Sequence, residues 1–259
     1  MPIEDRGEGA PPRVNFLDVQ IDALEMNDVL RRLARAPATA PFSYVVTPNV
    51  DHVVKLSERG DTNDALRAAY ARASIRICDS RILAALARLR GIRLPVVPGS
   101  DLTARLLTDV IQPGDRIALV GGMPETLTAL RRQYPGIDFH QHIPPMGMRN
   151  NRAAMESAAD FVAATNPRFA FLAVGSPQQE LLGALIAERK GATGIGVCVG
   201  ASIDFLTGAS RRAPRAMQKM GLEWAHRLLS DPRRMWRRYL VEGPRIFWIA
   251  ARWRPDAGR

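Results

Sequence analysis

The sequence predicts an α/β protein with a mostly parallel sheet, helices on both faces and a basic helical appendage. Three observations lead to this prediction. Short apolar runs rich in β-branched residues alternate with runs of helical spacing. Glycine or proline stands at most of the transitions between them. The charge is uneven, because residues 211–259 hold twelve Arg and one Lys against four acidic residues, and so carry +9 of the chain's net +10.

The predicted elements alternate along the chain. The clearest strand is Ser43–Thr47, a β-branched and aromatic run that stops at Pro48. The other strands are Val14–Leu17, Ile75–Cys78, Arg116–Val120, a run around Phe139, Arg168–Val174 and Ile195–Val199. The helices are Met26–Ala36, Asp61–Arg72, Arg81–Arg90, Asp101–Val110, one opened by Pro124, Asn151–Ala164 and one opened by Pro177. Strand and helix in alternation predict parallel pairing with helices on both faces.

Composition narrows the class of protein. Of the 259 residues, 46% are hydrophobic and 24% are charged, which indicates a globular chain and excludes disorder for most of its length. The two cysteines, Cys78 and Cys198, both lie in apolar runs, which favours a reducing compartment over a disulfide framework. No apolar stretch reaches the roughly 18 residues of a membrane span, and the N-terminal residues lack the apolar core of a signal peptide.

Three regions are expected. Residues 1–12, rich in Gly, Pro and charge, are predicted to be a disordered leader, residues 13–210 a catalytic domain, and residues 211–259 the appendage. The appendage also holds all four tryptophans. Its residues Met217, Met220, Trp224 and Leu228 share one helical stripe and predict a helix packed on the body. Residues 246–254 combine apolar and Arg side chains and predict an interfacial amphipathic segment.

Polar residues that directly follow strands are the first site candidates, because ligands of parallel sheets bind beyond the carboxyl ends of the strands. Thr47 and Asn49 follow the first clear strand, although Asn49 alone is also a good helix N-cap. Asp79 follows the predicted strand Ile75–Cys78. An aspartate at this position is equally compatible with a helix N-cap and with a catalytic carboxylate.

Three further segments stand at strand ends. Gly121 and Gly122, ahead of Pro124, can bring backbone N–H groups against a phosphate, but they lack the spacing of a dinucleotide or P-loop motif. Gln179 lies in the Gly175–Glu180 segment and Asp204 in Gly200–Gly208. In the appendage, Arg227, Arg234 and Arg237 are spaced to converge, and convergent arginines need an anion between them.

A set of motifs in fixed order carries a family resemblance. The motifs are TPNVDH, CDS, PGSDL, GGMPE, IPPMG, VGSPQQE, VGASIDFLTG, RRAPRAMQKMGLEWAHRL and DPRRMWRRY. Together, over about residues 14–245, they resemble the WecG/TagA/CpsF glycosyltransferases, glycosyltransferase family 26. The resemblance implies a Rossmann-like domain whose helical appendage touches the membrane and completes the active site.

The resemblance also implies the reaction. Such enzymes transfer a sugar with inversion from a UDP-sugar to a polyprenyl-diphosphate-linked saccharide on the inner face of the cell membrane. They need no metal or other cofactor, and the absence of a D-x-D motif here agrees with this. We therefore expect a hexosyl or N-acetylhexosaminyl transferase of cell-surface or exopolysaccharide synthesis, cytoplasmic and peripheral on an anionic membrane. The sequence is also compatible with a homo-oligomer.

Residue roles follow from the same resemblance. It makes Asp79 the catalytic base with Thr47 and Asn49 beside it. It also implies that the substrates are bound by Gln179, Asp204, Arg227, Arg234 and Arg237. The turn at Gly121 and Gly122 is expected to add backbone N–H donors for the diphosphate of the donor.

The chain departs from the family pattern at two positions. Ser80 stands where glycine is usual after the base. An arginine common before the (T/A)-G-x-D-L segment is missing, and Arg93 is the candidate to replace it.

Two other function classes share features with this sequence. A basic, aromatic appendage also suits a nucleic-acid-binding protein. A nucleotide-dependent dehydrogenase is disfavoured because the G-x-G-x-x-G fingerprint is absent.

Overall fold

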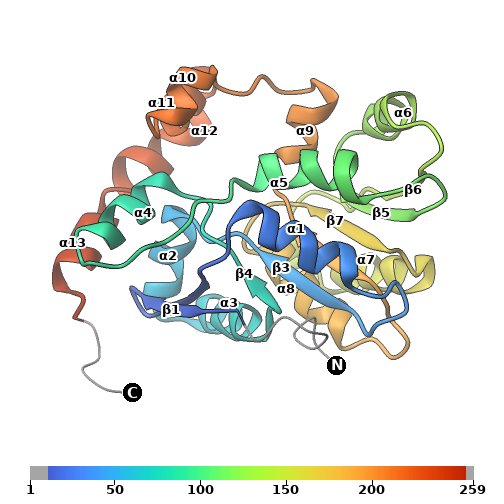
Figure 1. Cartoon of the computed structure of the whole chain (residues 1–259), viewed down its shortest axis with the longest axis horizontal. Coiled ribbons are helices and arrows are strands. Elements are labelled where there is room, and N and C mark those ends of the chain that lie inside the picture. The colour runs from blue at the N-terminus through green and yellow to red at the C-terminus, as the bar shows by residue number, and fades with distance from the viewer. Residues whose placement is uncertain (1–10, 255–259) are drawn as a thin grey trace.

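The centre of the protein is a six-stranded parallel sheet (Figure 1). The computed structural model describes residues 11–254, apart from the side chains of Arg215, Lys219 and Arg234. The strand order is β4-β3-β8-β7-β5-β6, and every neighbouring pair is parallel. The strands are β3 (Ser43–Val46), β4 (Ile75–Arg76), β5 (Arg116–Gly121), β6 (Asp138–His142), β7 (Phe169–Ala173) and β8 (Ile195–Cys198). The predicted parallel α/β fold is confirmed.

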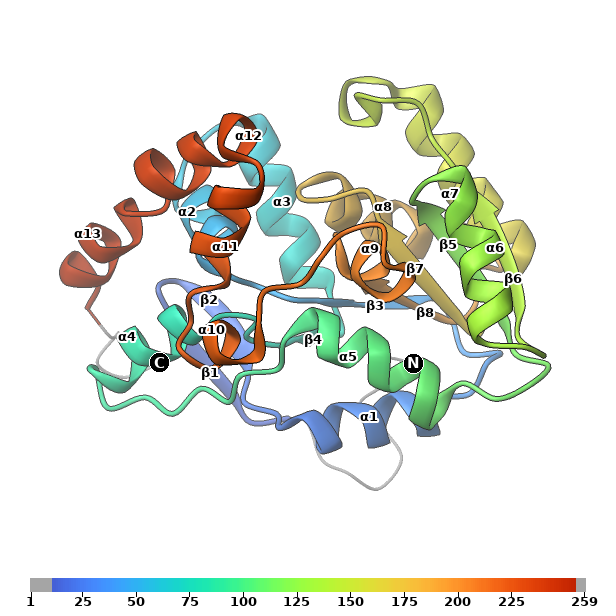
Figure 2. The same cartoon turned by 90° about the horizontal axis from the view of Figure 1, so that it is seen from above.

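Helices cover both faces of this sheet, as Figure 2 shows. One face carries α2 (Val50–Ser57), α3 (Asp61–Arg72), α7 (Arg152–Thr165) and α8 (Gln178–Ala187). The other carries α1 (Met26–Arg35), α5 (Gly99–Arg105) with the π-helical turn η1 (Leu106–Val110), α6 (Pro124–Gln133) and α9 (Ser202–Thr207). Within β7, Ala170 and Leu172 face the first layer whereas Phe169 and Phe171 face the second. Strands buried on both sides explain the continuous apolar runs in the sequence.

The N-terminal strands do not join the main sheet. β1 (Arg13–Phe16) and β2 (Val19–Asp22) form a separate antiparallel hairpin, of which the sequence analysis predicted only the first strand. Leu17 and Asp18 make its two-residue turn with φ of 55° and 60°, the conformation that matches strand twist. Residues 1–10 of the predicted leader lie outside the described residues, while the carbonyl of Pro12 already accepts a hydrogen bond from the N–H of Ala23 at 2.8 Å.

The last helices lie at the opposite end of the molecule from β6 and α6 (Figure 1). Next to them lies α4 (Arg81–Arg88), and η2 (Met148–Asn150) is a short turn before α7. The C-terminal elements are α10 (Arg215–Lys219), α11 (Glu223–Ser230), α12 (Pro232–Trp236), the π-helix η3 (Arg237–Glu242) and α13 (Arg245–Arg252). The single helix predicted through Met217 and Leu228 is wrong, because Gly221 with φ of 73° separates α10 from α11. Within residues 11–254, no helix has the length and apolarity that a membrane crossing requires.

α13 is attached to the body by apolar side chains. Ile246, Ala250 and Trp253 are buried in the core shared with the β1–β2 hairpin. The ring of Trp253 meets that of Phe16 edge-on at 5.3 Å, and its Nε1 donates to Oδ1 of Asp18 at 3.2 Å. The interfacial face predicted for residues 246–254 is therefore mostly a packing face. Burial of this size is worth about 1.5–3 kcal/mol for each large side chain.

Candidate active site

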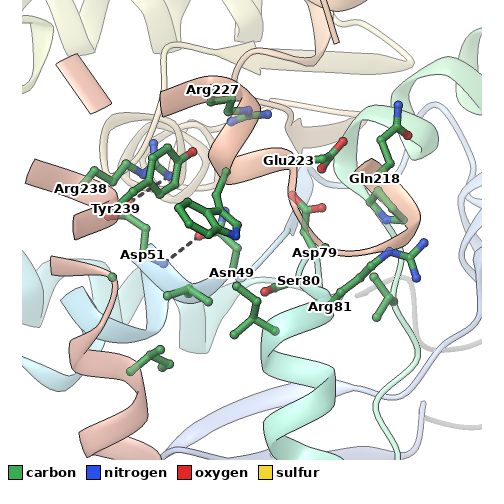
Figure 3. Close-up of a pocket in the computed structure, with 18 of the residues that line it drawn as sticks. Asn49, Asp51, Asp79, Ser80, Arg81, Gln218, Glu223, Arg227, Arg238 and Tyr239 are labelled. Atoms are coloured by element: carbon green, nitrogen blue, oxygen red, sulfur yellow. Dashed lines mark hydrogen bonds and ion pairs between the residues drawn. The ribbon is translucent and has the colours of Figure 1, made fainter. Parts of the chain in front are cut away.

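A pocket of about 460 Å³ lies beyond the carboxyl ends of β3 and β4 (Figure 3). This volume is within the range of about 300–1,000 Å³ common for ligand sites. The body contributes the first turns of α2 and α4 and the segment before α5. More than half of the lining residues come from residues 211–259, so the C-terminal helices complete the pocket.

Asp79 lines this pocket just after β4. Its backbone N–H donates to the carbonyl of Pro48 at 2.9 Å, which joins the ends of β3 and β4. The N-cap of α4 is Ser80, whose hydroxyl accepts from the N–H of Leu83 at 3.2 Å. Ser80, and not Asp79, therefore caps α4, which leaves the catalytic role for Asp79. The φ of Ser80 is −152°, an extended value, so the turn requires no glycine there.

Burial controls the protonation of Asp79. Desolvation raises the pKa of the Asp79 carboxyl to about 7, because a charged carboxylate is poorly solvated there. A hydrogen bond from the Gly99 N–H and the charges of Arg227 and Arg212 lower this pKa, whereas the charge of Glu223 raises it. These three charged residues all belong to the C-terminal segment. A carboxyl that titrates near pH 7 is suited to act as a general base at neutral pH.

The pocket-lining residues between Arg212 and Phe247 form what we call the C-terminal wall. Charged contacts hold this wall next to Asp79. The guanidinium of Arg227 lies over the Phe205 ring of α9, 5.2 Å from its centroid. Arg212 pairs with Asp101 of α5 and with Oε1 of Glu223, the latter at 3.3 Å. Figure 3 shows Arg227 and Glu223 on the same side of the pocket above Asp79. The wall therefore brings two cations, Arg227 and Arg212, and one further carboxylate, Glu223, close to the candidate base.

A third arginine of this wall is Arg238. It lines the pocket, and its Nη2 lies 3.2 Å from Oδ2 of Asp51 in the first turn of α2. Arg237, the residue favoured by the sequence, is 74% exposed, pairs with Glu242 at 3.2 Å and does not line the pocket. The side chain of Arg234 lies outside the described residues. Because η3 is a π-helix, the 3.6-residue spacing used for the prediction does not apply to it.

With this geometry in place, the comparison with known families is informative. The model of the glycosyl transferase WecG/TagA/CpsF family matches residues 14–259. The chain belongs to the WecG/TagA/CpsF glycosyltransferase family. The resemblance seen in the ordered motifs is thereby confirmed, and the enzyme is a glycosyltransferase of cell-surface polysaccharide synthesis.

In this glycosyltransferase, the segment after β3 is fixed from both sides. Asn49 caps α2, since its Oδ1 accepts from the N–H groups of Asp51 at 3.0 Å and His52 at 3.4 Å, and it also lines the pocket. Thr47 is buried below the pocket, and its Oγ1 donates to the carbonyl of Cys198 at 3.3 Å. Both predicted residues therefore lie at the strand end next to Asp79, one at the surface of the cavity and one beneath it.

The other predicted residues gather at the carboxyl ends of β5, β7 and β8, outside the Asp79 pocket. Gln179 is buried and bridges two segments: Oε1 accepts from the Gly200 N–H at 3.0 Å, and Nε2 donates to Glu180 at 2.9 Å. Asp204 is partly buried in α9. At Gly121, a Cβ would lie 2.6 Å from the carbonyl oxygen of Ala173, so only glycine allows this approach.

Two remaining predictions also have a place in the structure. Gly122 follows β5 with φ of 75°, and a Cβ there would lie within 3.2 Å of the side chains of Thr126 and Gln141. Arg93 is 90% exposed, lies 3.5 Å from Glu25 and does not line the pocket. The structure thus brings Asp79, Asn49 and Arg227 together in one cavity and places Gly122 and Arg93 elsewhere.

The pH dependence of transfer tests the environment of Asp79. A base must be ionised to accept a proton, so we expect kcat/KM to fall as the pH drops through about 7. Glu223→Gln removes a charge that raises the pKa of Asp79, and we expect it to move this acidic limb to lower pH. Asp101→Asn, which removes the other partner of Arg212, is the matched control and leaves the limb in place. An acidic limb that Glu223→Gln does not move would contradict this electrostatic assignment.

Proposed function

We propose that this enzyme transfers a hexosyl or N-acetylhexosaminyl unit from a UDP-sugar to a polyprenyl-diphosphate-linked saccharide, with inversion and without a metal. The observation that carries this proposal is the partly buried Asp79 at the strand ends, beside a C-terminal wall that contributes Arg227. Attack by an acceptor hydroxyl needs a base within hydrogen-bond reach, and Asp79 takes that proton. Its carboxyl, with a pKa raised to about 7, releases the proton again near neutral pH.

The leaving group determines what else the site must do. As the anomeric bond breaks, negative charge develops on the UDP diphosphate, and fixed positive groups stabilise it. Arg227, which lines the pocket with Asp79, is the candidate for this role, and the glycine turn that follows β5 at the same edge of the sheet is the candidate to add backbone N–H groups. Gln179 and Asp204 then belong to the donor side of the same edge.

A panel of donors tests the proposal. The purified protein is incubated with UDP-glucose, UDP-N-acetylglucosamine, UDP-N-acetylmannosamine and the corresponding uronic acid, together with a polyprenyl-diphosphate saccharide. Release of UDP that depends on the acceptor, and a product with inverted anomeric configuration, are the expected results. Retention of configuration would contradict the single-displacement mechanism.

The charge pairing within the appendage disfavours the nucleic-acid alternative. Arg212 and Arg245 pair with Asp101 and Glu58 of the body. Cations that hold two parts of one chain together are not free to neutralise a phosphate backbone, which is what nucleic-acid affinity depends on.

Insensitivity to chelation follows from the metal-independent mechanism. The sequence has no D-x-D motif, and among the described residues no group of three or more His, Cys, Asp or Glu side chains is arranged to hold a metal ion. We expect transfer to continue at an unchanged rate in excess EDTA. Inactivation by EDTA that manganese or magnesium reverses would overturn the assignment of charge stabilisation to arginine.

An exposed apolar surface supports membrane association of the appendage. Trp236, Val241 and Trp248 are each more than half exposed, and the guanidinium of Arg252 lies 3.9 Å from the centroid of the Trp248 ring. Tryptophan and arginine together are typical of segments that bind at a lipid interface. We propose that this surface rests on the anionic inner face of the cell membrane.

Vesicle binding tests the membrane surface. We expect Trp236→Ala combined with Trp248→Ala to weaken binding to phosphatidylglycerol vesicles, and salt to weaken it further, because each basic residue near such a surface contributes about 1 kcal/mol. Turnover of a water-soluble acceptor analogue stays at the wild-type rate. Trp253→Ala is unsuitable here, because Trp253 is buried against Phe16. Unchanged vesicle binding in the double variant would contradict the proposed surface.

A further inference from the structure

The pocket has two chemically different parts. Around Asp79 the lining is polar and includes Asn49, Glu223 and Arg227. Between α2, α4 and the η3–α13 segment it is apolar, and there it is lined by Val50, Ile82, Leu240, Pro244, Ile246 and Phe247. We call this second part the apolar arm. Figure 3 shows the labelled polar groups above and side chains built only of carbon below them.

The apolar arm leads from the candidate base to the outside. Leu240 and Phe247 line it and are nevertheless 56% and 57% exposed. Val241 and Trp248, their neighbours in the chain, continue the apolar surface beyond the pocket. Exposed apolar area of this kind is unfavourable in water at about 25 cal/mol per Å², so a hydrocarbon ligand that covers it is stabilised.

The guanidinium of Arg238 lies on the same side of the pocket as Leu240 of the apolar arm. Arg238 belongs to η3, directly before Tyr239 and Leu240, and also lines the pocket. Its Nε is buried without a hydrogen-bond partner among the described residues, while its Nη2 is held by Asp51. A guanidinium with donor capacity to spare, next to an apolar channel, is suited to a phosphate that carries a hydrocarbon chain.

From these three features, we propose that the apolar arm is the subsite for the hydrocarbon chain of the acceptor, with Arg238 binding its diphosphate. This inference rests on the proposed function and adds where the lipid enters. The saccharide hydroxyl then reaches Asp79 from the polar part, and the chain leaves the enzyme beside Phe247 toward the exposed apolar surface. The chain passes between the body and the C-terminal wall, so both must be in place to bind it.

Direct binding tests this subsite without any need for turnover. Calorimetry compares methyl diphosphate with farnesyl diphosphate, which have the same charged group and different chains. For the wild-type chain we expect farnesyl diphosphate to bind at least about tenfold more tightly, because several methylene groups leave water. Phe247→Asp removes most of this preference. Leu229→Asp is the matched control, since Leu229 is an exposed apolar residue of α11 that does not line the pocket, and it keeps the preference.

The diphosphate contact has its own variant. Arg238→Ala weakens both ligands by a similar factor, since it removes the cation and leaves the arm in place. Equal affinity of the wild-type chain for the two diphosphates, or a full chain preference in Phe247→Asp, would overturn the subsite. If the chain preference is found but no UDP-sugar supports transfer, the proposed function is wrong while the subsite stands. The two failures are therefore distinguishable.

Discussion

Asp79→Asn is expected to lower the rate of transfer by about 10²–10⁴-fold while the enzyme still binds UDP. The substitution keeps the shape of the side chain and removes its ability to take a proton. The expected loss of rate equals the contribution that general base catalysis usually makes. The measurement is kcat with saturating donor and acceptor, beside calorimetric binding of UDP. A variant that retains more than about a tenth of the wild-type kcat would show that another group removes the proton.

The same variant has a predicted effect on stability with a definite sign. The pKa of Asp79 is raised in the folded protein to about 7, above that of an exposed aspartate. The wild-type fold therefore loses stability as the pH rises toward 7, because the poorly solvated carboxylate must ionise. We expect Asp79→Asn to have the higher melting temperature at pH 8, with a smaller difference at pH 4. Equal melting temperatures at pH 8 would mean that Asp79 is better solvated than its burial implies.

Truncation after Ser210 is expected to abolish transfer altogether. It removes more than half of the residues that line the pocket, among them Arg227 and Arg238. A catalytic domain of residues 13–210, as predicted from the sequence, implies a body that folds without the appendage. The structure changes this expectation, since the cut also withdraws Ile246, Ala250 and Trp253 from the core. We expect a body that is less stable by several kcal/mol and inactive even with a water-soluble acceptor.

Two controls separate lost chemistry from lost stability. A chain that ends after residue 254 keeps every described residue and serves as the matched truncation. Trp253→Ala costs about 3 kcal/mol or more, a fall in melting temperature of roughly 6–12 °C, and leaves kcat unchanged at low temperature. Transfer at the full wild-type rate by the chain ending at Ser210 would show that the C-terminal arginines take no part in the reaction.

The candidate base Asp79 and its neighbour Asn49 could be predicted from the sequence. Asp79 and Asn49 follow short apolar strands, and the rule that ligands bind beyond the carboxyl ends of parallel strands selects such positions without a structure. The ordered motifs added Arg227, which the structure places in the same cavity. Asp79 also illustrates how capping alternatives are resolved, because only coordinates show that Ser80 occupies the cap.

The C-terminal segment could not be predicted in the same way. Sequence spacing assumes one regular helix, whereas Gly221 interrupts it and η3 winds with a different period, so Arg238 rather than Arg237 reaches the pocket. Trp253 looked interfacial because its partner Phe16 lies at the far end of the chain, and no local pattern reports such a contact. Glu223 and Arg212 lie within the RRAPRAMQKMGLEWAHRL motif, but their electrostatic effect on Asp79 follows only from their position in the fold.

The contact between Trp253 and the hairpin also governs when the enzyme becomes complete during synthesis. Trp253 and Asp18 are 235 residues apart in the chain. At a translation rate of about 5–20 residues per second, the hairpin waits on the order of ten to fifty seconds for the ring that covers Phe16. During this interval the nascent chain exposes the hairpin core and has no closed pocket. We therefore expect a growing chain of this enzyme to stay inactive until the last helix has docked.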